Sequence, residues 1–136
     1  MKTLAEQLIA AYQQEKQLYD RVLELVDEQT RIMSEQPNPR RVLEICREVE
    51  DLMGDIEAVE RAIRPLKQEW QETRSDPTGE LDRLLASIEK QIERISERQQ
   101  NVQEGLLAYV EREKQTMDEA RASINARRAG NLYRAG

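Results

Sequence analysis

The stretch "VLEICREVEDLMGDIEAVERAIRPLKQEW" (42–70) carries the clearest structural signal in the chain. Its large apolar side chains recur at alternating steps of three and four residues, at Val42, Ile45, Val49, Leu52, Ile56, Val59, Ile63, Leu66 and Trp70. That spacing places them on one face of an α-helix. Asn38 is a preferred N-cap residue and Pro39 suits the first helical position, so we expect the helix to begin there. Pro65 removes one backbone hydrogen bond, and we expect it to kink the last turns.

Two short stretches divide the chain into three such segments. "SEQPNPR" (34–40) and "SDPTGE" (75–80) each combine proline with other turn-forming residues, which favours a break in regular structure. The segment before the first break also has helical spacing, with apolar side chains at Leu4, Leu8, Ala11, Leu18, Val22, Leu25 and Ile32. Glu15 and Gln29 fill the two gaps in that row. The sequence therefore predicts a helix on each side of the first break.

The segment after the second break predicts a longer helix. We expect it to start near Pro77 or Thr78, and its apolar row consists of Leu81, Leu85, Ile88, Ile92, Ile95, Val102, Leu106 and Tyr109. Gln99 is the one polar member of this row. Further along the chain the row weakens, but the helical spacing persists to about Ala129, and Gly130 is a natural helix stop.

The lengths of the three helices predict their arrangement. Two helices of about 33 residues and one of about 50 would span roughly 50 Å and 75 Å at 1.5 Å per residue. Because short loops make neighbouring helices antiparallel, the sequence predicts an all-α fold, an antiparallel three-helix bundle or coiled coil. The third helix would overhang at the C-terminus. We therefore expect residues 1–112 to form the bundle and residues 113–136 to form a partner-binding overhang of the same domain.

The charges change sign near the start of this overhang. Residues 1–120 carry 17 basic and 27 acidic side chains, a net charge of −10, whereas residues 121–136 carry four arginines and no acid. Arg127 and Arg128 would lie at the end of the helix, where cations interact favourably with the helix dipole. The acidic body, with −6 for the whole chain, argues against nucleic-acid binding, and binding through the basic tail remains only a minor alternative.

The sequence offers no catalytic, cofactor-binding or metal-binding motif. It contains no histidine, so the commonest general base and metal ligand are missing, and Cys46 is the only cysteine. We expect Cys46 to be a buried hydrophobe, and Gln29 and Gln99 to fix the register of the helices. No stretch is apolar enough for a membrane span, and no apolar run near the N-terminus resembles a signal peptide. We therefore expect a cytoplasmic protein that is not an enzyme, with no cofactor and no membrane insertion.

Several stretches resemble the FlgN family of flagellar type III export chaperones. "LYDRVLELVDEQTRIM" (18–33) resembles the first helix of that family, and "VLEICREVEDLMGDIEAVERAI" (42–63) is similar to the second. "ERQQNVQEGLLAYVEREKQTM" (97–117) resembles the third helix, and "YRAG" (133–136) resembles a common ending of the family. FliT, another flagellar chaperone with a helical bundle, is the alternative family.

The resemblance implies a function in bacterial flagellum biogenesis. FlgN-like chaperones bind the helical C-terminal segments of hook–filament junction proteins of the FlgK and FlgL type, keep them soluble and deliver them to the FlhA-type export gate. By this resemblance, the contact with the gate would use Tyr133, beside Leu132. An overhanging amphipathic helix can also receive a client helix, and its contact face would consist of Leu107, Val110, Met117, Ala120 and Ile124.

A structural or adaptor protein is the alternative interpretation of the same features. In that case the C-terminal helix would pair with a second copy of itself and form a homo-oligomer through a coiled coil.

Overall fold

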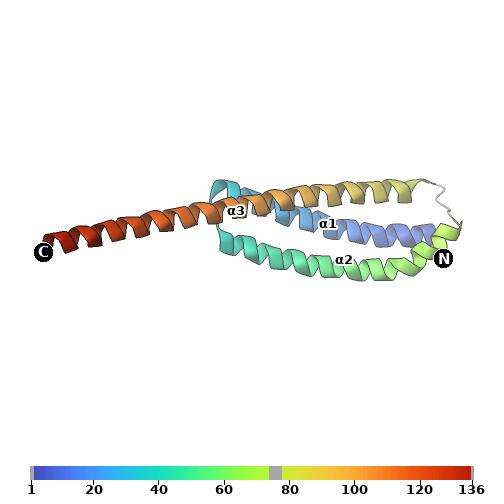
Figure 1. Cartoon of the computed structure of the whole chain (residues 1–136). Helices are drawn as coiled ribbons and strands as arrows, with labels where there is room; N and C mark the ends of the chain where they lie inside the picture. The colour runs from blue at the N-terminus through green and yellow to red at the C-terminus, as the bar shows by residue number, and fades with distance from the viewer. Residues whose placement is uncertain (1, 74–77, 136) are drawn as a thin grey trace. The chain divides into compact units, whose positions relative to one another are not determined.

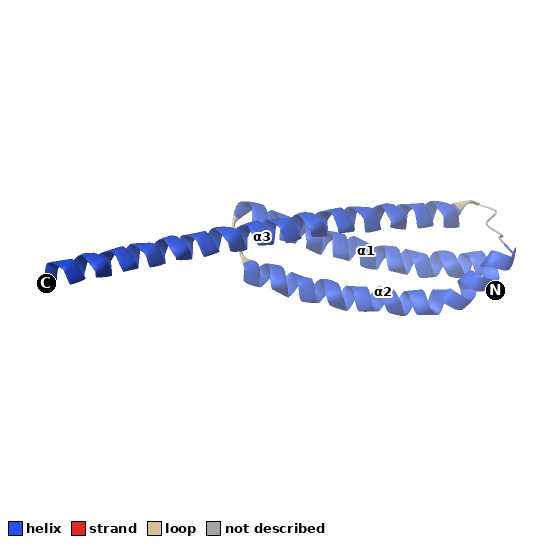
Figure 2. Cartoon of the chain, viewed as in Figure 1, coloured by secondary structure: helices blue, strands red, loops and turns tan. Residues whose placement is uncertain are grey.

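Helices make up every regular element of the described chain. The computed structural model describes residues 2–73 and 78–135, and for Thr73 and residues 131–135 it describes the backbone alone. The helices are α1 (Leu4–Glu35), α2 (Pro39–Thr73) and α3 (Glu80–Ala135), and no strand occurs within the described ranges (Figure 2). The predicted all-α class and the three helices are therefore confirmed.

Side-chain caps fix the starts of α1 and α2. The Thr3 hydroxyl oxygen accepts a hydrogen bond from the backbone N–H of Glu6 at 3.2 Å. The Asn38 side-chain oxygen accepts one from the backbone N–H of Arg41, also at 3.2 Å. Each cap satisfies an N–H that has no partner within its helix. The prediction that α2 begins with the Asn38 cap and Pro39 is confirmed.

The third helix starts slightly later than the sequence indicated. It begins at Glu80, because Gly79 adopts a φ of 68°, in the left-handed region, and this turns the chain out of the helix. The Thr78 hydroxyl oxygen accepts a hydrogen bond from the backbone N–H of Glu80 at 3.3 Å. Glu80 and Asp82 lie in the first turn, where negative charge interacts favourably with the helix dipole.

The predicted helix stop at Gly130 is wrong. The backbone of α3 continues through Gly130 to Ala135, and Gly79 is the glycine with a positive φ in the described chain. Glycine ends a helix by adopting the left-handed conformation, and in a helical conformation it only weakens the helix, by about 1 kcal/mol relative to alanine. The bend expected near Pro65 agrees with the structure: Pro65 lies inside α2, which continues to Thr73 and bends in its last turns (Figure 1).

Residues Met1–Val102 form one compact unit, in which α1 packs against both α2 and the first part of α3 (Figure 1). Near the α1–α2 connection, Arg41 forms an ion pair with Glu28 at 3.1 Å. Along the other contact, Gln91 donates a hydrogen bond to Asp20, and Arg98 pairs with Asp27. Since both α1–α3 pairs are separated by 71 residues, α1 and α3 run in the same direction. The helix between them is antiparallel to both.

The core of this unit follows the predicted rows on α1 and α2 more closely than on α3. The buried apolar side chains are Leu8, Tyr12, Tyr19, Val22, Leu25, Val26, Val42, Ile45, Val49, Ile56, Ile63, Leu81, Ile88, Ile95 and Val102. On α3 the buried apolar members recur every seven residues. Between them Gln91 is buried, whereas Ile92 is 40 % exposed and Gln99 is exposed, so the row predicted for α3 is wrong at these positions. At this inner position Gln91 donates a hydrogen bond to Asp20 of α1.

Residues Gln103–Gly136 form a second compact unit, which contains the last part of α3. This division lies before the boundary at residue 112 that we expected from the sequence. Between residues 103 and 130 no side chain is fully buried, and Leu106 and Tyr109 are half-buried. Every residue from 111 to 130 is exposed. Residues 111–130 of α3 therefore present their side chains to solvent.

Candidate partner-binding surface

Four large apolar side chains of the second unit are exposed. Leu107 is 61 % exposed, Val110 58 %, Met117 56 % and Ile124 50 %. All four belong to the contact face predicted from the sequence, and Ala120, its fifth member, is exposed as well. The structure therefore shows that these side chains are accessible. Their role in binding a partner stays a prediction.

The exposed apolar residues are aligned along one side of α3. Val110, Met117 and Ile124 are seven residues apart, which is close to two helical turns, so they lie one above another. Leu107 lies three residues before Val110, and Ala120 lies three residues after Met117, beside the same line. We call Leu107, Val110, Met117, Ala120 and Ile124 the C-terminal row. From Val110 to Ile124 it is about 21 Å long at 1.5 Å per residue.

A row of cations lies beside the apolar C-terminal row. Lys114, Arg121 and Arg128 each follow a member of the apolar row, Val110, Met117 and Ile124 respectively, by four residues. All three cations are exposed, and none forms an ion pair with another residue of the described ranges. Residues four apart on a helix are surface neighbours, so each cation flanks one apolar side chain. We call Lys114, Arg121 and Arg128 the cationic row.

The cationic row was not predicted from the sequence, where only Arg127 and Arg128 were expected to lie at the end of the helix. With α3 ending at Ala135, Arg127 and Arg128 lie about two turns before the last helical residue. The influence of the helix dipole falls off within the last turn, so that attribution is wrong for both arginines. The seven-residue spacing of the cations was the signal that could have revealed the row.

The predicted tail residues Leu132 and Tyr133 lie outside the side chains that the structure describes. Their backbone belongs to α3, so the expectation that they follow a helix stop is wrong. A role for Tyr133 in contacting an export gate stays a prediction.

The first unit contains a buried carboxyl group that no motif indicated. Glu15 of α1 is only 2 % exposed, and its side chain hydrogen-bonds to Glu60 of α2. Burial raises the pKa of Glu15 to about 8, the hydrogen bond and negative charge of Glu60 add to this effect, and the charge of Lys67 opposes it. The second carboxyl oxygen of Glu15, Oε2, has no hydrogen-bond partner. Burial and the neighbouring carboxylate therefore favour the protonated form of Glu15.

Two buried tyrosines flank Glu15 along α1. Tyr12 and Tyr19 lie one turn before and one turn after Glu15, and both are buried. Burial raises the pKa of Tyr12 to about 12, and the negative charges of Glu60 and Glu15 add to this effect. Burial also raises the pKa of Tyr19, again with a contribution from the charges of Glu15 and Glu60. Two neighbouring carboxyl groups can perform acid–base chemistry when substrate reaches them. Because Glu15 is enclosed in the helix packing, we interpret this pair as part of the core.

Gln29 connects α1 to the beginning of α2. Its side-chain amide donates hydrogen bonds to the backbone oxygen of Val42 at 2.9 Å and to the Cys46 sulfur at 3.2 Å. These contacts fit the predicted role of Gln29 in fixing the register of the two helices. Gln99 is exposed and lines a shallow pocket with Gln29 and Cys46, and Cys46 itself is only half-buried. The expectations of a row position for Gln99 and full burial for Cys46 are therefore wrong.

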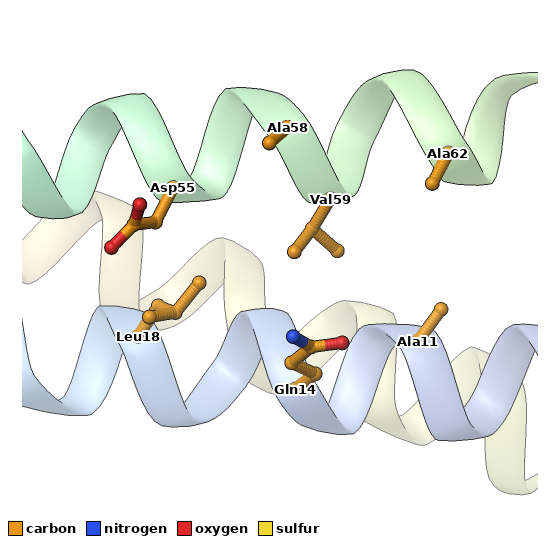
Figure 3. Close-up of a pocket in the computed structure, with 7 residues that line it drawn as sticks. All are labelled: Ala11, Gln14, Leu18, Asp55, Ala58, Val59 and Ala62. Atoms are coloured by element: carbon orange, nitrogen blue, oxygen red, sulfur yellow. The ribbon is translucent and has the colours of Figure 1, made fainter.

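An open cleft of about 450 Å³ lies between α1 and α2. The residues that line it are mostly small and apolar: Ala11, Gln14, Leu18, Asp55, Ala58, Val59 and Ala62. Gln14 and Asp55 are the polar members. Figure 3 shows the side chains of the two helices facing each other. Alanines leave this space because their side chains do not reach across the helix contact. The cleft brings together no nucleophile and base, so its residues suggest packing and not a reaction.

Within residues 2–73 and 78–135, no group of three or more His, Cys, Asp or Glu side chains is placed to hold a metal ion. In the same ranges, no helix combines the length and the apolar character that crossing a membrane requires.

Comparison with known proteins adds no relative to these observations. No protein-family model, no curated protein and no solved structure matches the chain.

Proposed function

We propose that this protein is a cytoplasmic, FlgN-like flagellar export chaperone without enzymatic activity. It binds the helical C-terminal segments of hook–filament junction proteins of the FlgK and FlgL type and keeps them soluble. It then delivers them to the FlhA-type export gate, through a contact that includes Tyr133. The resemblance of the three helices to that family supports the identity of the clients. The single structural observation that supports the binding role is the exposed C-terminal row on α3.

The exposed surface is suited to a reversible contact with another helix. Burying a large apolar side chain completely contributes about 1.5–3 kcal/mol, and the four large members of the C-terminal row are 50–61 % exposed. Covering them would therefore contribute roughly 3–6 kcal/mol before the entropic cost of association. A client helix laid along this row would be released again, which handover to an export gate requires.

Self-association through the same row is the second candidate function. The seven-residue spacing of Val110, Met117 and Ile124 is typical of the first apolar position of a coiled-coil repeat. The other apolar position of that repeat falls on Glu113, Ala120 and Arg127. Two of these three residues are charged, which weakens the seam between identical helices.

Removing residues 113–136 tests the proposal. The truncated protein should fail to retain C-terminal segments of hook–filament junction proteins in a pull-down that the full-length protein passes. Its thermal unfolding should remain nearly unchanged, because the buried core ends at Val102. Full capture of these segments by the truncated protein would refute the proposal. A light-scattering mass that rises with concentration, and returns to that of a monomer on truncation, would instead support self-association.

A further inference from the structure

The cationic row points to the chemistry of the helix that covers the C-terminal row. We propose that this partner is an amphipathic helix with a line of acidic side chains beside its apolar face, and that these acids pair with Lys114, Arg121 and Arg128. The inference rests on the proposed function, since it specifies the charge pattern of the partner that binds the same surface.

The geometry places the cations where a docked helix would meet them. At about 100° per residue, each cation lies about 40° around the helix from the apolar residue that precedes it by four positions. A helix that covers Val110, Met117 and Ile124 therefore brings its own flanking residues next to Lys114, Arg121 and Arg128. These cations form no ion pair with the described residues, so they are available to a partner.

A second copy of this helix supplies no acid at the flanking position that would meet the cationic row. If Val110, Met117 and Ile124 face a partner helix, the flanking position opposite to the cationic row falls on Tyr109, Thr116 and Ser123, none of which is charged at neutral pH. In a parallel pair of copies the cations would therefore meet Tyr, Thr or Ser, and in an antiparallel pair they would meet each other. Charge complementarity thus favours a different, acidic helix as the occupant.

Two synthetic helical peptides test this inference on the full-length protein. Both have the same apolar face of leucine and isoleucine, and they differ only in the residues beside it, which are glutamate in one and lysine in the other. Exposed ion pairs are weak, but three of them together should make the glutamate peptide bind about 10-fold more tightly at low salt. The preference should shrink at high salt, because exposed charges are screened.

Charge-reversal variants locate the effect. The triple variant Lys114→Glu, Arg121→Glu, Arg128→Glu should reverse the preference, so that the lysine peptide binds more tightly. Arg121→Glu alone should reduce the preference. The matched control Arg112→Glu should leave it unchanged, because Arg112 is also exposed but lies about 140° around the helix from Met117. Circular dichroism confirms that the variants keep their helix content.

The outcomes separate this inference from the proposed function. Equal binding of the two peptides, no binding of either, or an unchanged preference in the triple variant would overturn the inference. Junction-protein segments that still bind in any of those cases would leave the chaperone proposal intact. Conversely, if the glutamate peptide binds with the predicted preference and the junction-protein segments do not bind, the surface accepts acidic helices, and the identity of the clients is wrong.

Discussion

The buried carboxyl of Glu15 makes the stability of the bundle depend on pH. Its pKa is raised from 4.5 to about 8 in the folded protein, so between these values the folded state holds a proton that the unfolded state has released. Stability should therefore be highest below about pH 4.5 with respect to this group, fall as the pH rises, and level off above about pH 8. Replacing Glu15 with Gln removes the titration while keeping a side chain of similar shape that can donate a hydrogen bond to Glu60.

The size of the effect follows from the shift in pKa. Each unit corresponds to about 1.4 kcal/mol, so the full shift sets an upper limit of roughly 5 kcal/mol for the loss of stability between acid and alkaline pH. The true loss will be smaller, because the helices can relax around an ionised Glu15. At pH 5 the wild type and Glu15→Gln should have similar free energies of unfolding. At pH 9 the variant should be the more stable by a few kcal/mol.

Urea unfolding followed by circular dichroism at pH 5, 7 and 9 measures this difference. Glu57→Gln is a matched control, since Glu57 is exposed on the same helix as Glu60 and its replacement should leave the pH profile parallel to that of the wild type. A Glu15→Gln profile that is also parallel to the wild type would refute the reasoning, because Glu15 would then titrate in the same way in the folded and unfolded states.

Two further predictions concern the ends of the helices. Asn38→Ala removes the cap of the Arg41 N–H and should lower the free energy of unfolding by about 1 kcal/mol in urea titration, whereas an unchanged value would show that the cap is dispensable. Gly79→Ala forces a side chain into a φ of 68° and places its Cβ 3.3 Å from Nη1 of Arg83, so it should lower stability by about 1–2 kcal/mol. Gly54→Ala, where the added Cβ meets no atom within 4 Å, should be neutral or stabilising in the same assay.

The helices and most of the core could be predicted from the sequence, since they depend on local patterns. The apolar row from Val42 to Trp70 and the cap at Asn38 both favour a helix through residues that are close together in the sequence. Gly130 could not be interpreted in this way, because glycine permits a helix stop without requiring one. Its backbone conformation depends on whether the helical or the left-handed conformation has the lower free energy at that position of α3.

The features that escaped prediction depend on contacts between distant segments. Gln91 is buried whereas Ile92 is exposed, and the hydrogen-bond partner of Gln91, Asp20, lies 71 residues earlier in the chain. Glu15 stood out as a gap in an apolar row, but its partner Glu60 could be identified only from the packing of α1 on α2. For the candidate site, the apolar residues were predicted from their spacing, whereas Arg128 of the cationic row was explained by a helix end that the structure places further along.

The most direct test of the account is the binding of a junction-protein C-terminal segment to the variant Met117→Asp, measured by calorimetry. We expect affinity to fall at least about 10-fold, because a charge in the middle of the C-terminal row would be buried against an apolar helix. The thermal unfolding temperature should hardly change, since Met117 is exposed. Leu43→Asp, at a similarly exposed apolar residue of α2, should bind like the wild type. Wild-type affinity in Met117→Asp would contradict the claim that the C-terminal row binds the client.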